Sequence, residues 1–247
     1  MAIRNNQIYL VHKPEIKLSE TLIFLDVEGI PDQNFYYLIG LVVATADSNN
    51  TFSFWADNQD QEEIIWKQFL AIVGGYESFT LLHYGSYETE FMEKMWRKYS
   101  VIDNGNDEAL ITKIKSNSIN VLSLIYANIY FPTYSNGLKD IGTYLGAQWS
   151  AEDASGLQSL VWRHKWALAK DEAFKQKLIE YNSEDILAIK IVLQAIIGIS
   201  GNGNNSSDAL NILLAEDVKS DPERRKFKRN AFALEELEFV NKCAYFD

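Results

Sequence analysis

The sequence predicts an α/β fold in which a mixed sheet of about five strands is flanked by helices. Three β-rich runs near the N-terminus are separated by short turns, so we expect them to pair antiparallel. Helical and strand-like segments then alternate, which favours further strands added to the same sheet. The later part of the chain carries long stretches of helical periodicity.

The first three strands are expected to form one antiparallel unit. Residues 21–27 (TLIFLDV) are apolar on both faces, as in a central strand that is covered from both sides. A turn over 29–32 leads into a second, β-branched and aromatic strand at 35–45. Residues 47–50 are typical of a hairpin turn, and 51–55 alternate as a third strand.

Helices and short strands are expected to alternate after this unit. Residues 59–73 have helical spacing, and a strand at 79–83 and a helix at 86–99 follow. Residues 104–107 are predicted to be a loop. The apolar side of the first of these helices is predicted to consist of Ile64, Ile65, Phe69 and Ile72.

The second half of the chain is expected to be mainly helical. A buried segment at 119–127 precedes a helix at 136–145, which Gly146 ends. Residues 158–169 and 172–199 form two further predicted helices, the second long and strongly periodic.

The chain is expected to divide into three parts. Residues 1–200 form the folded domain, and 201–208 (GNGNNSSD) form a flexible linker. Residues 209–247 form a predicted C-terminal extension, with a basic run at 224–229 and an acidic helix near 234–240. The abrupt end of the chain suggests that it belongs to a longer protein.

Composition places the chain among globular proteins, with 47% hydrophobic and 13% aromatic residues. The lone cysteine, Cys243, excludes an intrachain disulfide framework and a multi-cysteine zinc site. Because no stretch has the length of a membrane span and no cleavable apolar leader is found, we expect a cytoplasmic location without membrane contact. The net charge of −11 is unusual for a nucleic-acid binder, so basic residues would have to act locally.

Asp26 and Glu28 are expected to lie at the end of the first strand, on the same face because alternate side chains share a face. The Asp-x-Glu pattern also occurs at 60/62 and 221/223, where polar surroundings favour solvated charges. Only the first pair follows a buried strand. Burying two carboxylates at the end of such a strand costs free energy unless a cation compensates their charge, so we interpret this pair as functional.

Asp185 lies within the predicted apolar stripe of the last long helix. A carboxylate in such a stripe is unexpected unless a metal or another cation meets it. Tyr181 is four residues earlier, so the two side chains are neighbours. A buried Tyr–Asp hydrogen bond without catalysis is the alternative. The stripe consists of Phe174, Leu178, Tyr181, Ala188, Val192 and Ala195.

Glu88 opens the helix that follows the strand ending at His83. An acidic residue in a first helical turn complements the helix dipole, so the pattern alone indicates a structural role. His83 is typical of a histidine satisfied at a strand end. Together with the other carboxylates, however, Glu88 would complete an oxygen-rich site suited to Mg²⁺ or Mn²⁺. Two such ions about 4 Å apart can hydrolyse a phosphodiester.

These motifs resemble those of the DEDD exonuclease superfamily, RNase H-like proteins. LDVEG at 25–29 matches the first motif, HYGSYE at 83–88 the second more loosely, and YNSED at 181–185 the third. NGLKDIGTYLG at 136–146 is similar to the family helix that leads to a Leu-Gly pair. The match spans about residues 20–198 in the right order, closest to predicted nucleases fused to RecB-type domains.

The resemblance implies an RNase H-like fold and two divalent metal ions, Mg²⁺ or Mn²⁺, bound by Asp26, Glu28, Glu88 and Asp185. It implies that Tyr181 orients the attacking water. The histidine branch of the superfamily would carry its histidine at the position of Glu180, so the tyrosine type (DEDDy) fits better.

The second motif departs from the family pattern. Glu88 replaces the usual aspartate and Tyr84 the usual asparagine, which resembles a subfamily trait of the RecB-fused relatives. A further acid, Glu184, is expected to point to a different face from Asp185.

A 3′–5′ exonuclease acting on DNA or RNA, with a single strand as one possible substrate, is the leading functional prediction. A structure-specific endonuclease is the second hypothesis, because RNase H-like folds carry several activities. A non-catalytic domain that binds nucleic acid or docks a RecB-type nuclease domain is the third. The basic run at 224–229 is the first candidate for phosphate binding, followed by Lys139 and Arg163. Trp162 and Trp166 are expected to pack rather than stack on bases.

Overall fold

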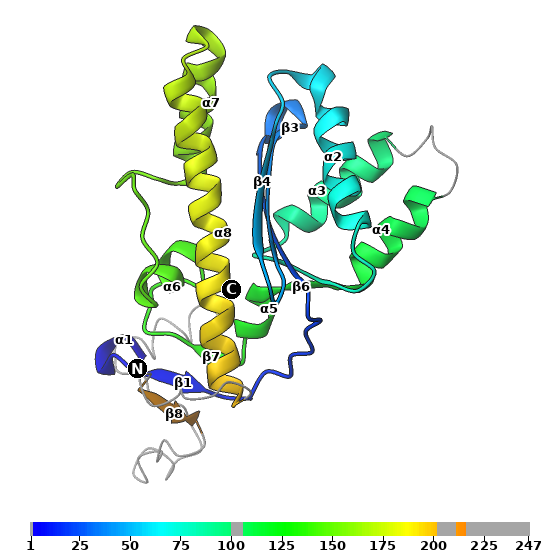
Figure 1. Ribbon diagram of the computed structural model, residues 1–247. Helices are drawn as coiled ribbons and strands as arrows, with labels where there is room; N and C mark the ends of the chain where they lie inside the picture. Colours follow the sequence, from blue (N-terminus) through cyan, green and yellow to red (C-terminus); the bar gives the residue numbers. More distant parts are fainter. Residues whose placement is uncertain (1, 100–105, 202–210, 216–247) are drawn as a thin grey trace, which may run out of the picture.

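The computed structural model describes residues 2–99, 106–201 and 211–215 (Figure 1). In these residues the larger sheet has five strands in the order β4-β3-β2-β5-β6. The strands are β2 (Leu22–Ile30), β3 (Phe35–Ala44), β4 (Asn49–Trp55), β5 (Thr80–His83) and β6 (Ser118–Asn120). β2, β3 and β4 pair antiparallel, whereas β5 and β6 continue the sheet in parallel. The predicted mixed α/β fold is therefore confirmed.

Helices cover both faces of this sheet (Figure 1). On one side lie α2 (Glu62–Gly74), α3 (Tyr87–Tyr99) and α4 (Asn106–Ser116). On the other lie α5 (Val121–Ile125), α6 (Leu138–Tyr144), α7 (Gly156–Ala169) and α8 (Glu172–Ser200). The central strands β2 and β3 are buried along nearly their whole length, because their side chains are apolar toward both layers. No described helix is long and apolar enough to cross a membrane.

A second, three-stranded sheet was not predicted. Its order is β7-β1-β8, formed by Ile129–Tyr130, Ile8–Leu10 and Ile212–Leu214. β1 pairs antiparallel with β7 and parallel with β8, a strand from beyond the predicted linker. Strands of two or three residues leave too little periodicity to detect, and their partners are distant in sequence. A short helix, α1 (Ala2–Asn5), precedes this sheet.

Several predicted boundaries were wrong. β2 continues to Ile30 through a β-bulge at Glu28/Gly29, so the two carboxylates lie within the strand, and the turn is a 3-10 helix at Pro31–Gln33. β4 begins at Asn49, inside the predicted turn. A second 3-10 helix, Gln59–Gln61, precedes α2.

Two further segments differ from the prediction. The segment 119–127 divides between the end of β6 and α5, because the Asn120 side chain accepts a hydrogen bond from Leu122 N and starts a helix there. α4, which begins within the predicted loop at 104–107, was not predicted at all.

The buried side of α2 also differs from the predicted stripe. Ile64 is 56% exposed, whereas Ile65 beside it is 1% exposed, because consecutive helical residues point about 100° apart. The buried side consists instead of Ile65, Trp66, Phe69, Leu70 and Val73.

We expect Ile65→Ala to destabilise the protein by about 2–5 kcal/mol, because it opens a cavity in the core between α2 and the sheet. Ile64→Ala is the matched control on the same helical turn, and its effect should stay within about 0.5 kcal/mol. Urea unfolding followed by circular dichroism measures both. Equal effects of the two substitutions would show that the packing of α2 is wrong.

Candidate active site

Three carboxylates converge at the centre of the large sheet. Asp26 and Glu28 project from the same face of β2, and Asp185 projects toward them from α8. One oxygen from each lies within 4.8 Å of the others, and all three side chains are buried. The strand alternation and the helical stripe that singled out these residues therefore bring them together in space.

Burial strongly perturbs these carboxyl groups. Desolvation raises the pKa of Asp26 well above its usual value, and the charges of Asp185, Glu28 and Glu88 raise it further. Desolvation likewise raises the pKa of Glu28 to about 8 and that of Asp185 to about 6. A cation placed among the three groups would remove both the repulsion and part of the desolvation penalty.

Asn182 holds Asp26 in place and was missed in the sequence. Its Nδ2 donates to the Asp26 Oδ2 at 2.6 Å and to the Asp26 backbone oxygen at 3.0 Å. Asn182 is fully buried on α8, opposite Gly40 of β3. Gly40 pairs with Asp26 in the sheet, and a Cβ on it would lie 1.7 Å from the Asn182 Oδ1. The glycine thus leaves the space that the amide fills.

Glu28 and Asp185 also receive hydrogen bonds that the sequence did not reveal. The Ser159 hydroxyl donates to the Glu28 Oε2 at 2.7 Å, with the Tyr37 hydroxyl at 3.5 Å. The Trp149 indole Nε1 donates to the Asp185 Oδ1 at 2.6 Å. None of these three donors belongs to a sequence motif, so nothing in the sequence connects them with the carboxylates.

Tyr181 contacts Asp185, as its position one helical turn earlier predicts. The phenol hydrogen bonds to the Asp185 carboxylate, and burial raises the pKa of Tyr181, so the phenol stays protonated. Its ring packs against the buried Trp162, and the Lys139 ammonium lies 4.6 Å from the ring centroid. Tyr181 is therefore held between a carboxylate and a cation.

Glu88 lies at the edge of this cluster. It lines the same cavity of about 270 Å³ as the three carboxylates, and its charge raises the pKa values of Asp26 and Glu28. Its Oε2 lies 3.6 Å from the His83 Nδ1, and neither of these buried atoms has a hydrogen-bond partner. Glu88 is not within the 4.8 Å group. Glu88 thus lines the site, with its Oε2 against His83.

Other residues considered in the sequence have structural contacts. The Tyr84 hydroxyl donates to the Asn136 backbone oxygen. Glu184 accepts from Ser150 N, the residue after the Trp149 that donates to Asp185. Trp162 and Trp166 are both buried, in agreement with packing. The basic run 224–229, the Asp-x-Glu pair 221/223 and Cys243 lie outside the described residues.

Arg163 is not a surface phosphate ligand. It is 3% exposed, donates to the Asp57 backbone oxygen at 2.7 Å and lies within 5.5 Å of four aromatic ring centroids. Lys139 also has a structural bond, to the backbone oxygen of Ala154.

The pair Asp60/Glu62 shows why the Asp-x-Glu pattern alone is weak. Glu62 is fully buried, contrary to the expectation of a solvated charge. It accepts from Tyr36 N, from the Tyr99 hydroxyl and from the Lys98 ammonium, so its charge is fully compensated by protein groups. The Glu62 carboxylate therefore needs no metal to balance its charge.

The carboxylate cluster, by contrast, fits hard divalent cations. Every side-chain ligand that it offers is an oxygen, which suits Mg²⁺ or Mn²⁺ better than zinc. Its internal donors satisfy only some of the carboxylate oxygens, and the Oε2 of Glu88 has none.

Fold and site together define an α/β protein with a buried cluster of carboxylates on the central strand of a mixed sheet. A family model described as the RNase H superfamily matches residues 23–197, more than two thirds of the chain. The chain therefore belongs to the RNase H superfamily. None of the curated proteins compared with the chain matches it. RNase H-like nucleases use divalent metals, so membership supports a metal-dependent nuclease, a hydrolase whose substrate is a nucleic acid.

The metal-free protein is expected to lose stability as the pH rises from about 4.5 to 8. In this window the folded state binds more protons than the unfolded chain, because the carboxyl pKa values are raised in the folded state. The Tm measured in EDTA should fall by roughly 5 °C or more across it. Mn²⁺ should restore most of this loss at pH 8 and little at pH 5.

The double variant Asp26→Asn, Glu28→Gln is the control for this measurement. It removes the two most strongly shifted carboxyl groups, so its Tm should depend less on pH and should not respond to Mn²⁺. A wild-type Tm that is independent of both pH and Mn²⁺ would contradict the proposed electrostatics.

Gly40→Ala should destabilise the protein by about 1–3 kcal/mol, because the new methyl group meets the buried Asn182 amide. Gly156→Ala provides the comparison, since its Cβ would enter open space at the start of α7, and it should be neutral or slightly stabilising. Thermal unfolding distinguishes them. Equal stability of the two variants would mean that Asn182 does not fill the space beside Gly40.

Proposed function

We propose that the protein is a 3′–5′ exonuclease of the tyrosine-type DEDD class, acting on single-stranded DNA or RNA. The observation that supports this most is the set of three buried carboxylates within 4.8 Å, beside a tyrosine bound to one of them. The subtype and an association with a RecB-type nuclease domain rest on motif resemblance.

In this proposal Asp26, Glu28, Glu88 and Asp185 hold two divalent ions, Mg²⁺ or Mn²⁺. These ions would offset the charge of the scissile phosphodiester and activate the attacking water. Asn182, Ser159 and Trp149 fix the carboxylates by hydrogen bonds, so the ligand set is assembled before substrate arrives. Glu88 lies outside the 4.8 Å group, so its side chain would have to shift toward the other three carboxylates to bind an ion with them.

Tyr181 is proposed to orient the attacking water. Its phenol is protonated across the physiological range and donates its hydrogen to Asp185, so its oxygen can accept a hydrogen bond from the water but cannot act as the base. The ring is fixed by its contacts with Trp162 and Lys139. A fixed acceptor beside the carboxylates restricts the direction from which water can approach the phosphate.

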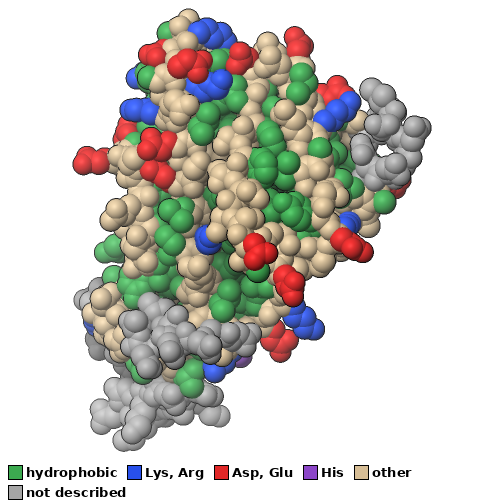
Figure 2. All heavy atoms as spheres, viewed as in Figure 1, with side chains coloured by type: hydrophobic (Ala, Val, Ile, Leu, Met, Phe, Trp, Pro, Cys, Tyr) green, Lys and Arg blue, Asp and Glu red, His purple; other side chains and the backbone are tan. Residues whose placement is uncertain are grey.

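Basic residues on the α7–α8 hairpin are candidates for local phosphate contacts despite the acidic net charge. Each lies over an aromatic ring within 5.5 Å, which holds its ammonium group on this surface. Lys177 is eight residues before Asp185, about 12 Å along the helix axis. Figure 2 shows basic side chains, among acidic ones, at the end of the molecule that carries this hairpin. The residues are Lys165, Lys170, Lys175 and Lys177.

The test uses 5′-labelled single-stranded DNA and RNA with Mn²⁺ or Mg²⁺, with product ladders resolved on a gel. Wild type should shorten the strand stepwise from its 3′ end. Asp26→Asn and Asp185→Asn should each lose activity at least about 100-fold, because each removes a charge from the ligand set. Asp47→Asn, at an exposed position in the turn between β3 and β4 and outside the lining of the carboxylate cavity, should leave activity unchanged.

The same assay separates the alternatives. Cleavage of a 3′-blocked or circular strand at wild-type rate would favour an endonuclease. Metal binding without cleavage of any substrate would favour a non-catalytic domain. Glu88→Gln, compared with Glu90→Gln at an exposed position of α3, reports whether the fourth carboxylate takes part. If Asp26→Asn cuts as fast as wild type, the assignment of the site is wrong.

A further inference from the structure

A second cavity adjoins the carboxylate site. It measures about 620 Å³ and shares Leu160 with the cavity of the carboxylates, while the segment Ile30–Asp32 contributes to both. The residues that line it come from the turn after β2, the end of β4 and the helix α7. A strand whose phosphate reached the carboxylates would therefore have this cavity beside it.

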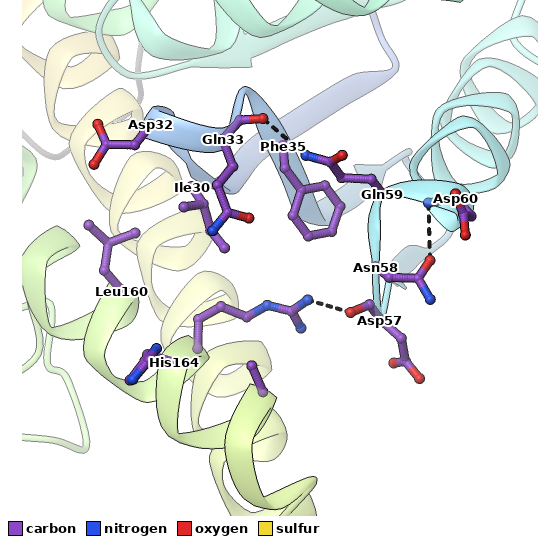
Figure 3. Close-up of a pocket in the computed structure, with 12 residues that line it drawn as sticks. Ile30, Asp32, Gln33, Phe35, Asp57, Asn58, Gln59, Asp60, Leu160 and His164 are labelled. Atoms are coloured by element: carbon purple, nitrogen blue, oxygen red, sulfur yellow. Dashed lines mark hydrogen bonds between the residues drawn. The ribbon is translucent and has the colours of Figure 1, made fainter.

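The lining of this cavity combines apolar and hydrogen-bonding side chains (Figure 3). Ile30, Phe35 and Leu160 form its apolar wall. The side chain of Gln33 extends between them, and the Gln59 Nε2 donates to the Gln33 backbone oxygen at one edge. The carboxylates of Asp32 and Asp57 lie at its margin. An apolar wall with a few hydrogen-bonding groups is the usual lining of a site for a flat organic ring.

The charges around the cavity disfavour a phosphate as its occupant. Asp32, Asp57 and Asp60 all contribute to its lining, whereas Arg163 and His164 are its only basic residues. The only arginine there, Arg163, is buried and donates to the Asp57 backbone oxygen. A neutral group is favoured instead, above all one with amino hydrogens that carboxylate and amide oxygens can accept.

We propose that this cavity, the Phe35–Ala167 pocket, receives one unstacked nucleobase of the strand that is being cut. The inference rests on the proposed nuclease function and adds a base-binding site to it. Holding one base outside the stack would place its neighbouring phosphate at the carboxylates and would select single strands over duplex, because a paired base is not free to enter.

The experiment measures kcat/KM on oligoadenylate strands that carry one abasic residue at successive positions from the 3′ end. Adenine is chosen for its amino group. For wild type, an abasic residue at one particular position should lower kcat/KM roughly tenfold, as expected for the loss of one base contact. An abasic residue at any other position should have little effect.

Two variants of α7 test the location of the site. Ala167→Phe fills the pocket from an exposed position, and Leu168→Phe adds an aromatic ring next to it, outside the lining. Ala167→Phe should lower kcat/KM on the intact strand roughly tenfold and match wild type on the strand that is abasic at the sensitive position. Leu168→Phe should match wild type on both. Circular dichroism checks that both variants fold.

The outcomes separate this proposal from the proposed function. If wild type cuts strands but no abasic position matters, or if the two variants behave alike, the pocket does not bind a base although the nuclease assignment stands. If wild type cuts no strand, the nuclease assignment fails, and binding of labelled strands in Ca²⁺ decides on the pocket. In that binding experiment, the base-binding role of the pocket is supported if Ala167→Phe binds the intact strand roughly tenfold more weakly than wild type and one abasic position weakens wild-type binding. Unchanged binding would overturn it.

Discussion

The repulsion among buried carboxylates on the central strand is the constraint on which the rest of this structure depends. Asp26 and Glu28 sit on a strand that is covered on both faces, and α8 brings Asp185 against them. Such a cluster persists only if the surrounding groups hold it rigidly and its charge is neutralised, by protons or by a cation. The buried amide of Asn182, the space beside Gly40 and the Trp149 indole are all explained by this requirement.

The structure also shows how a buried charge with a structural role differs from one with a chemical role. Glu62 is more deeply buried than Asp26, but three protein donors satisfy it. Arg163 is surrounded by aromatic rings that compensate its desolvated guanidinium. At the carboxylate cluster the protein donors are outweighed by desolvation and by the other carboxylates, so the pKa values of Asp26, Glu28 and Asp185 stay raised. A buried charged side chain therefore indicates a chemical function only when the groups around it fail to compensate its charge.

The sequence predicted the parts of the fold that have strong local periodicity, namely the first three strands and the helices α7 and α8. Asp26, Glu28 and Asp185 were found because their polarity breaks a buried pattern, whereas Glu88 came from resemblance alone. Asn182, Ser159 and Trp149 could not be found, since an ordinary side chain acquires a role only through a partner far along the chain. The strands β1 and β8 were not predicted for the same reason, because their pairing joins residues about 200 positions apart.

The long helix α8 connects two ends of the molecule with different surroundings. Its 29 residues span about 44 Å, from the hairpin with α7 at one end to the small sheet of β1 and β8 at the other (Figure 1). Asp185 lies near the middle of this helix, whereas the chain returns through β8 beside its far end. The small sheet that contains β1 and β8 therefore lies at the end of α8 away from the α7–α8 hairpin, and substitutions in it are expected to change stability more than the geometry of the carboxylate cluster.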